Sequence, residues 1–124
     1  MKKNKGFKRL RMAGVYAVNG ILAALRFEAA FRQEALLALV FIPIALLLDL
    51  TRTERVLLIL VTLLVLICEL LNSAIEAVVD RIGPEKHELS GRAKDMGSAA
   101  VLMCLLLWAY VWFELVVLAH WTGN

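Results

Sequence analysis

The sequence predicts an all-α membrane protein with an N-terminal amphipathic surface helix and three transmembrane helices. Of its 124 residues, 61% are hydrophobic, against roughly 45–50% in soluble globular domains. The mean hydropathy is +0.76, and the apolar residues gather in three long segments. A soluble domain of this length has too small a core to bury so many apolar side chains, so these segments predict membrane spans.

Four helices follow from the order of apolar and polar residues, and together they make one membrane domain over residues 1–124. Residues 6–26 mix basic and apolar groups, which is too polar for a span and suits a helix lying on the membrane surface. Residues 29–48 form the first span. Residues 54–82 form the second, which exceeds one crossing, so its last turns should project into the cytoplasm. Residues 91–119 form the third, which opens with small residues that permit close helix contact.

Short polar segments separate the spans. Thr51 and Thr53 can cap the second span, and Ser90 can cap the third. Gly83 and Pro84 should end the second span, because both residues favour helix ends.

Basic residues are concentrated on one side of the predicted spans. Those at the N-terminus include Lys2 and Lys3, others surround the loop after the second span, and none follows the third. The positive-inside rule therefore predicts a cytoplasmic N-terminus and an external C-terminus. Because the basic residues flank spans and form no single groove, they argue against nucleic acid as a partner.

The two cysteines, Cys68 and Cys104, both lie within predicted spans. No metal-ligand spacing surrounds them. We expect them to pack as small apolar residues, as free cysteines usually do.

A polar face interrupts the second span. At about 100° per residue, its members share one side of a helix; they are Glu69, Asn72, Ser73, Glu76 and Asp80. A carboxylate at membrane depth costs on the order of 2.5 kcal/mol or more, so it normally faces a bundle interior or a wet cavity and marks a functional site. Such polar groups need partners, which predicts a homo-oligomer.

These residues suit phosphoryl transfer to a lipid. That reaction needs Mg²⁺ on hard oxygen ligands, a group that takes the proton of the nucleophile, and cations on the phosphates. Glu28 and Glu76 could hold the metal, and Glu69 could take the proton. The sequence has no glycine-rich P-loop and no protein-kinase signature set, so a nucleotide would bind in an unrelated way.

The pattern E-x-L-N-S-A-I-E-x-x-V-D runs from Glu69 to Asp80, and two further motifs cover residues 28–34 and 88–101. Together they resemble the prokaryotic diacylglycerol kinase family. The resemblance implies a homotrimer in the bacterial inner (cytoplasmic) membrane, built from three-span subunits that each carry a surface helix. It also implies transfer of the γ-phosphoryl group of MgATP to diacylglycerol, giving phosphatidic acid.

The family's motifs imply roles for residues at matching positions. Glu69 would be the catalytic base, with Asn72, Asp80 and Asp95 in support, and the metal ion Mg²⁺ would be held by Glu28 and Glu76. The implied ATP-binding residues are Arg9, Tyr16, Glu28, Glu76, Glu85, Lys86, His87, Lys94 and Asp95. The implied substrate-binding residues are Arg9, Arg32, Gln33, Glu34, Arg55, Glu69 and Ser98.

Two other functions are consistent with these residues. An undecaprenol kinase of the same family would keep the chemistry and change the acceptor. A small membrane transporter or scaffold would use the acids as a proton relay without consuming ATP. For individual residues, the acids of the second span could form a structural polar network, and Asp80 and Asp95 could simply pair with Arg81, Arg92 or Lys94.

Overall fold

A computed structural model describes residues 5–121, in which every regular element is helical. This confirms the predicted all-α class. The elements are α1 (Gly6–Phe27), α2 (Ala29–Leu47), α3 (Arg52–Ile82), α4 (Glu88–Trp112), a π-helical segment (Phe113–Leu118) and α5 (Ala119–Trp121). The basic residues Lys2 and Lys3 lie outside the described part of the chain.

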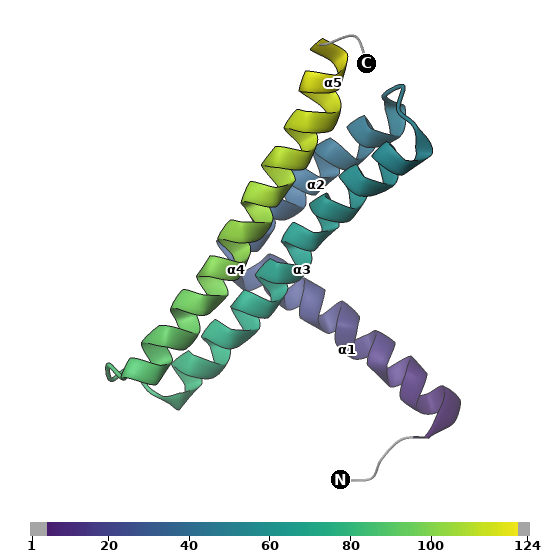
Figure 1. The fold of residues 1–124 in the computed structure, drawn as a ribbon. Coiled ribbons are helices and arrows are strands. Elements are labelled where there is room, and N and C mark those ends of the chain that lie inside the picture. Colours follow the sequence, from purple (N-terminus) through teal and green to yellow (C-terminus); the bar gives the residue numbers. More distant parts are fainter. Residues whose placement is uncertain (1–4, 122–124) are drawn as a thin grey trace.

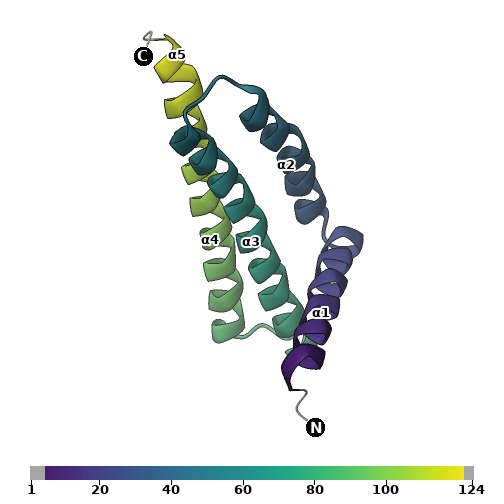
Figure 2. The same cartoon turned by 90° about the vertical axis from the view of Figure 1, so that its right-hand side faces the viewer.

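Helices α2, α3 and α4 run side by side, and each is antiparallel to the next along the chain (Figures 1 and 2). Contacts between α3 and α4 are the most extensive, followed by those between α2 and α3. The α2–α3 turn and α5 lie at one end of this bundle, and the α3–α4 turn lies at the other. Helix α1 leaves the bundle and runs toward the end that carries the α3–α4 turn (Figure 1).

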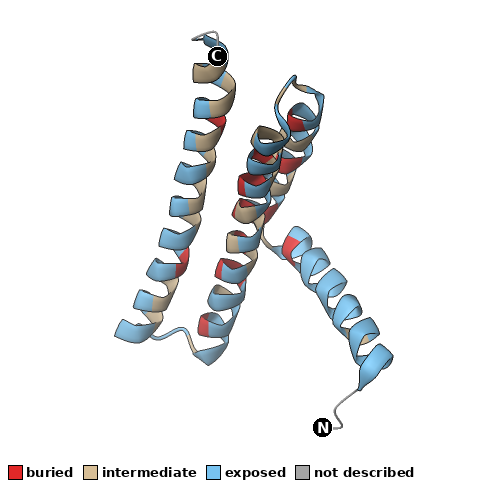
Figure 3. Cartoon of the chain, turned by 45° about the vertical axis from the view of Figure 1, so that its right-hand side comes forward, coloured by how far each residue is buried: buried red, intermediate tan, exposed pale blue. Residues whose placement is uncertain are grey.

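Within residues 5–121, four helices are long and apolar enough to cross a membrane: α1, α2, α3, and α4 with its continuation to Trp121. The predicted surface helix is therefore not too polar to span by composition, although its mean hydropathy of 1.2 is the lowest of the four. Its side chains are almost all exposed, with Ala24 buried (Figure 3). The surface position of α1 thus stays a prediction.

Two caps set the ends of α3. Thr51 and Glu54 form a capping box, in which Glu54 N donates to Thr51 Oγ1 (3.2 Å) and Thr51 N donates to Glu54 Oε1 (2.8 Å). This cap satisfies backbone groups that have no partner within the helix. The helix consequently begins at Arg52, two residues before the predicted boundary. At its other end α3 stops at Ile82, directly before Gly83, as expected.

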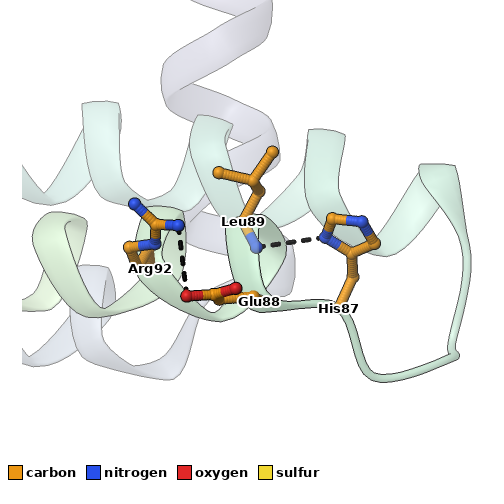
Figure 4. Close-up of polar contacts among 4 residues, drawn as sticks. All are labelled: His87, Glu88, Leu89 and Arg92. Carbon is orange, nitrogen blue, oxygen red and sulfur yellow. Dashed lines mark hydrogen bonds and ion pairs between the residues drawn. The ribbon is translucent and has the colours of Figure 1, made fainter.

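The cap of α4 differs from the prediction. His87, not Ser90, occupies the N-cap, and its Nδ1 accepts a hydrogen bond from the backbone N–H of Leu89 at 3.1 Å (Figure 4). Ser90 lies inside the first turn. The helix begins at Glu88 rather than residue 91 because His87 Nδ1 accepts a hydrogen bond from a backbone N–H of the first turn, as the side chain of an N-cap residue does.

The buried core lies near the α2–α3 turn. It consists of Ala45, Leu58, Val61 and Trp112, which come from α2, α3 and α4. Phe41 meets two indole rings edge-on, with its centroid 4.9 Å from Trp108 and 5.0 Å from Trp112. Such edge-to-face contacts stabilise aromatic clusters beyond the apolar area that they bury.

Thr62 joins α3 to α4 in this core. Its fully buried Oγ1 donates to the carbonyl of Leu58 (2.7 Å) and accepts from the indole N–H groups of Trp108 (3.1 Å) and Trp112 (3.2 Å). One hydroxyl thus satisfies two indole donors that would otherwise be unpaired in an apolar setting.

Thr62→Val should lower the free energy of unfolding by about 1–2 kcal/mol, because two indole donors lose their acceptor. Unfolding in detergent micelles measures this loss. Thr62→Ser keeps the hydroxyl and serves as the matched control. If the valine and serine variants were equally stable, the hydrogen bonds to Thr62 would contribute nothing.

Candidate functional site

The polar face of α3 faces α4 at the other half of the bundle. Glu69 is 4% exposed and Asn72 is 8% exposed. The Asn72 Nδ2 donates to Glu69 Oε2 at 3.5 Å and to the partly buried Glu76 Oε1 at 3.2 Å. The spacing of three and four residues puts all three side chains on one helix face. One amide therefore lies between two carboxylates and orients both.

Gly97 of α4 makes room for this amide. A Cβ atom at Gly97 would overlap Asn72 Oδ1, so a larger residue at this position would displace the Asn72 side chain. The Oδ1 atom is itself buried without a hydrogen-bond partner. With Oδ1 next to Gly97, the NH₂ group of the amide faces the two carboxylates.

Two more carboxylates act on Glu69. Glu28 lies between α1 and α2, and its charge and that of Glu76 both interact with Glu69. Glu34 of α2 also interacts electrostatically with Glu69, and its Oε2 is buried without a hydrogen-bond partner. The fold therefore brings four acids from three chain segments into one region. Their combined negative charge favours the binding of a cation there.

This acidic region does not hold a complete metal-ligand set of its own. Among residues 5–121, no group of three or more His, Cys, Asp or Glu side chains could hold a metal ion. Glu28 and Glu76 nevertheless fit Mg²⁺, because this ion is usually bound by one or two carboxylates together with water and substrate phosphates.

A polar cleft of about 510 Å³ lies at the α3–α4 turn. Its lining includes four predicted nucleotide-binding residues, Glu85, Lys86, His87 and Lys94. Lys94 Nζ pairs with Asp80 Oδ1 at 2.7 Å across α3 and α4. This is one of the pairings considered for Asp80 from sequence, and it places a cation at the cytoplasmic end predicted for α3.

Two apolar pockets follow α1 along the bundle. One, of about 670 Å³, lies between α1 and α3, and its polar side chains are those of Glu28 and Ser73. The other, of about 640 Å³, is lined from α1, α2 and α3. The two share Ile21 and Leu70, so they are adjacent. Together the two pockets form an apolar surface, and the carboxylate of Glu28 lies in the α1–α3 pocket.

The remaining predicted residues are more scattered. Arg32 donates to the carbonyls of Leu25 (3.0 Å) and Arg26 (3.1 Å) and so ties α2 to the end of α1. Arg9, Tyr16, Gln33, Asp95 and Ser98 are exposed in the single chain.

Arg55 lies at the opposite end of the bundle from the acids. It donates to the carbonyls of Ala45, Leu48 and Leu50 and thereby holds the α2–α3 turn. The fold therefore does not bring it together with the other predicted substrate-binding residues.

Sequence reasoning did not assign a role to Ser73 or Gly97. Ser73 was placed on the polar face, but only the packing of α1 shows that it lines a pocket with Glu28. Its Oγ is buried without a hydrogen-bond partner. The small residues at the start of the third predicted span were a signal of close approach, although they did not identify Asn72 as the neighbour.

The fold and the site define a class: an integral membrane protein with a buried acidic cluster between an apolar groove and a polar, cation-bearing cleft. The model of the prokaryotic diacylglycerol kinase family matches residues 15–116, and the chain belongs to this family. It is 53% identical over 116 residues to the diacylglycerol kinase of Pseudomonas aeruginosa, covering 94% of each chain.

Two further relatives carry the same name. The diacylglycerol kinase of Escherichia coli K12 is 55% identical over 114 residues, which cover 85% of this chain and 93% of the relative. The diacylglycerol kinase of Haemophilus influenzae is 48% identical over 112 residues, which cover 90% of this chain and 95% of the relative. The similarity therefore spans the whole region that contains the acidic cluster and the cleft.

Gly97→Ala should lower the kcat for diacylglycerol phosphorylation by about tenfold to a hundredfold, because the added methyl group displaces Asn72 and misplaces the carboxylates. Gly14→Ala is the matched control, since a Cβ at Gly14 of α1 meets nothing within 4 Å and Gly14 lines none of the three pockets described above. Steady-state kinetics in mixed micelles compares the two. Equal activity of both variants and the unchanged protein would contradict the positioning of Asn72 by Gly97.

Proposed function

We propose that this protein transfers the γ-phosphoryl group of MgATP to the hydroxyl group of diacylglycerol and releases phosphatidic acid. The observation that carries the proposal is the buried Glu69, held by Asn72 beside three other acids and near an apolar groove. Family membership supports the same reaction. The lipid substrate places the reaction at the membrane surface on which the α3–α4 turn lies.

Glu69 acts as the base in this proposal. Its carboxylate takes the proton of the lipid hydroxyl while that oxygen attacks the γ-phosphorus, and the bond between the γ-phosphorus and the bridging oxygen of ADP breaks. Asn72 donates to Glu69 Oε2, which holds the carboxylate in one orientation. A buried base is also shielded from bulk water, which limits wasteful hydrolysis.

The lipid lies along the apolar pockets beside α1. Its acyl chains contact the apolar lining that Ile21 and Leu70 share between the two pockets. The glycerol end faces Glu28 and Ser73, the polar side chains of the α1–α3 pocket. Because the Ser73 hydroxyl has no hydrogen-bond partner among the described residues, we assign it to an oxygen of the lipid.

The nucleotide binds in the polar cleft at the α3–α4 turn. Lys86, His87 and Lys94 provide hydrogen-bond donors for phosphate oxygens there. Asp80 lines this cleft, and Glu76 lies one turn, about 6 Å, nearer to Glu69 on the same helix. The phosphates would therefore extend along α3 from the cleft toward the base.

Glu28 and Glu76 would hold Mg²⁺ together with the nucleotide phosphates. When bound, the ion neutralises charge on the phosphates during transfer. The two carboxylates interact electrostatically with Glu69 from different chain segments. A metal ion held there would orient the nucleotide phosphates relative to the base.

Several chains assemble in the membrane, and a homotrimer is the assembly we propose. A large share of the long apolar side chains is exposed in the single chain, including Leu63, Ile67 and Leu71 beside the acidic face of α3. Lipid or neighbouring subunits would cover these positions. In this arrangement α1 lies on the cytoplasmic surface, the N-terminus is cytoplasmic and the C-terminus is external.

Glu69→Gln should reduce the kcat for diacylglycerol phosphorylation by about a hundredfold or more, because an amide cannot take the hydroxyl proton. Radiolabelled ATP and diacylglycerol in mixed micelles measure the reaction. Glu114→Gln, an exposed acid in the π-helical segment at the other end of the bundle, is the matched control. Full activity in Glu69→Gln, or preferential phosphorylation of undecaprenol when both lipids are offered, would overturn the assigned base or the assigned acceptor.

Lys94→Gln should raise the KM for ATP by about tenfold, because a charge-assisted contact to phosphate is lost. The KM for diacylglycerol should change much less. Arg92→Gln is the matched control, since Arg92 is an exposed cation on the same helix that pairs with Glu88 at 3.3 Å (Figure 4). A larger change in the KM for the lipid than for ATP would contradict a nucleotide site in this cleft.

A further inference from the structure

The two cysteines of the chain meet across α3 and α4. Cys68 Sγ lies 2.7 Å from Cys104 Sγ, although 36 positions separate them in the sequence. A covalent S–S bond is about 2.05 Å long, so the free thiol sulfurs are about 0.7 Å from bonding distance. Both cysteines are free thiols, as expected, but they contact each other as well as the apolar side chains around them.

The thiols lie in the same seam as the acidic cluster. Cys68 directly precedes Glu69 and is one helical turn from Asn72. Cys104 is two turns beyond Gly97, the residue against which Asn72 packs. Because α3 and α4 are antiparallel (Figure 1), both contacts join the same two helices one or two turns apart. Both cysteines are only partly buried in the chain, so a small reagent can reach them.

We propose that Cys68 and Cys104 form an oxidation site, at which a small uncharged peroxide converts the two thiols into an intrachain disulfide. One sulfur attacks the peroxide, becomes a sulfenic acid and releases water or an alcohol. The other sulfur then attacks the sulfenic sulfur, the S–S bond forms and a water molecule leaves. Each sulfur loses one electron overall, and the two electrons reduce the O–O bond.

The disulfide would join α3 to α4 covalently beside the candidate site. Because the sulfurs are already in contact, bonding requires only a small shift of side chains and preserves the packing of Gly97 on Asn72. The bond would also restrict the unfolded chain between two positions 36 residues apart. The oxidised protein should therefore unfold at a higher temperature than the reduced protein.

The experiment uses the full chain in detergent micelles. Reduced protein and protein treated with hydrogen peroxide or diamide are denatured, alkylated with a maleimide and weighed by mass spectrometry. We expect two maleimide adducts in the reduced protein, none after oxidation, and two again after treatment with dithiothreitol. The oxidised chain should migrate as a monomer in a non-reducing gel, and its midpoint of thermal unfolding should rise.

Cys68→Ser and Cys104→Ser are the matched controls, because each retains one thiol that has no partner in the chain. After oxidant treatment, the remaining thiol of each variant should either still react with maleimide or carry added oxygen. The midpoint of thermal unfolding of each variant should not rise. Two alkylatable thiols in the oxidant-treated unchanged protein would overturn the proposal. A covalent dimer that disappears on reduction would also overturn it, because the bond would then join two chains.

Discussion

The structure depends on one constraint: an acid that is buried in a membrane-spanning helix needs a hydrogen-bond donor or a cation. Glu69 meets this need through Asn72, whose amide also reaches Glu76. Gly97 leaves room for this amide where α4 packs against α3. The position of the third predicted span relative to the second is therefore tied to the chemistry of a single polar face.

The two halves of the α3–α4 seam differ in character. Near the α2–α3 turn, Thr62 satisfies two indole donors and the surrounding side chains are apolar. Toward the α3–α4 turn, α3 carries Asn72 and Ser73, whose Oδ1 and Oγ atoms are buried without a hydrogen-bond partner among residues 5–121. Asn72 Oδ1 is covered by Gly97 of α4, whereas Ser73 lines the α1–α3 pocket, so Ser73 is the residue with hydrogen-bonding capacity left for a ligand. This division places stability and binding at opposite ends of one helix pair.

Much of this arrangement was predictable from local patterns. Long apolar runs predicted the helices, the 3.6-residue period put Glu69, Asn72 and Glu76 on one face, and Gly83 predicted the end of α3. Local patterns were less reliable at the N-cap of α4, where His87 caps instead of Ser90. Several residue types can accept a hydrogen bond at a cap, so the sequence permitted both. Local sequence patterns also could not show that Arg55 would hold the α2–α3 turn.

The sequence by itself determined the membrane class, the helical elements and the acidic face, because each depends on residues that are neighbours along one helix. Only the tertiary structure decided which side chains meet across helices: Asn72 with Gly97, Cys68 with Cys104, and the two indoles with Thr62. The periodicity of each helix specifies which face is buried, but not the rotation and axial offset between two helices. Those follow from the combined packing of large and small side chains along the whole seam.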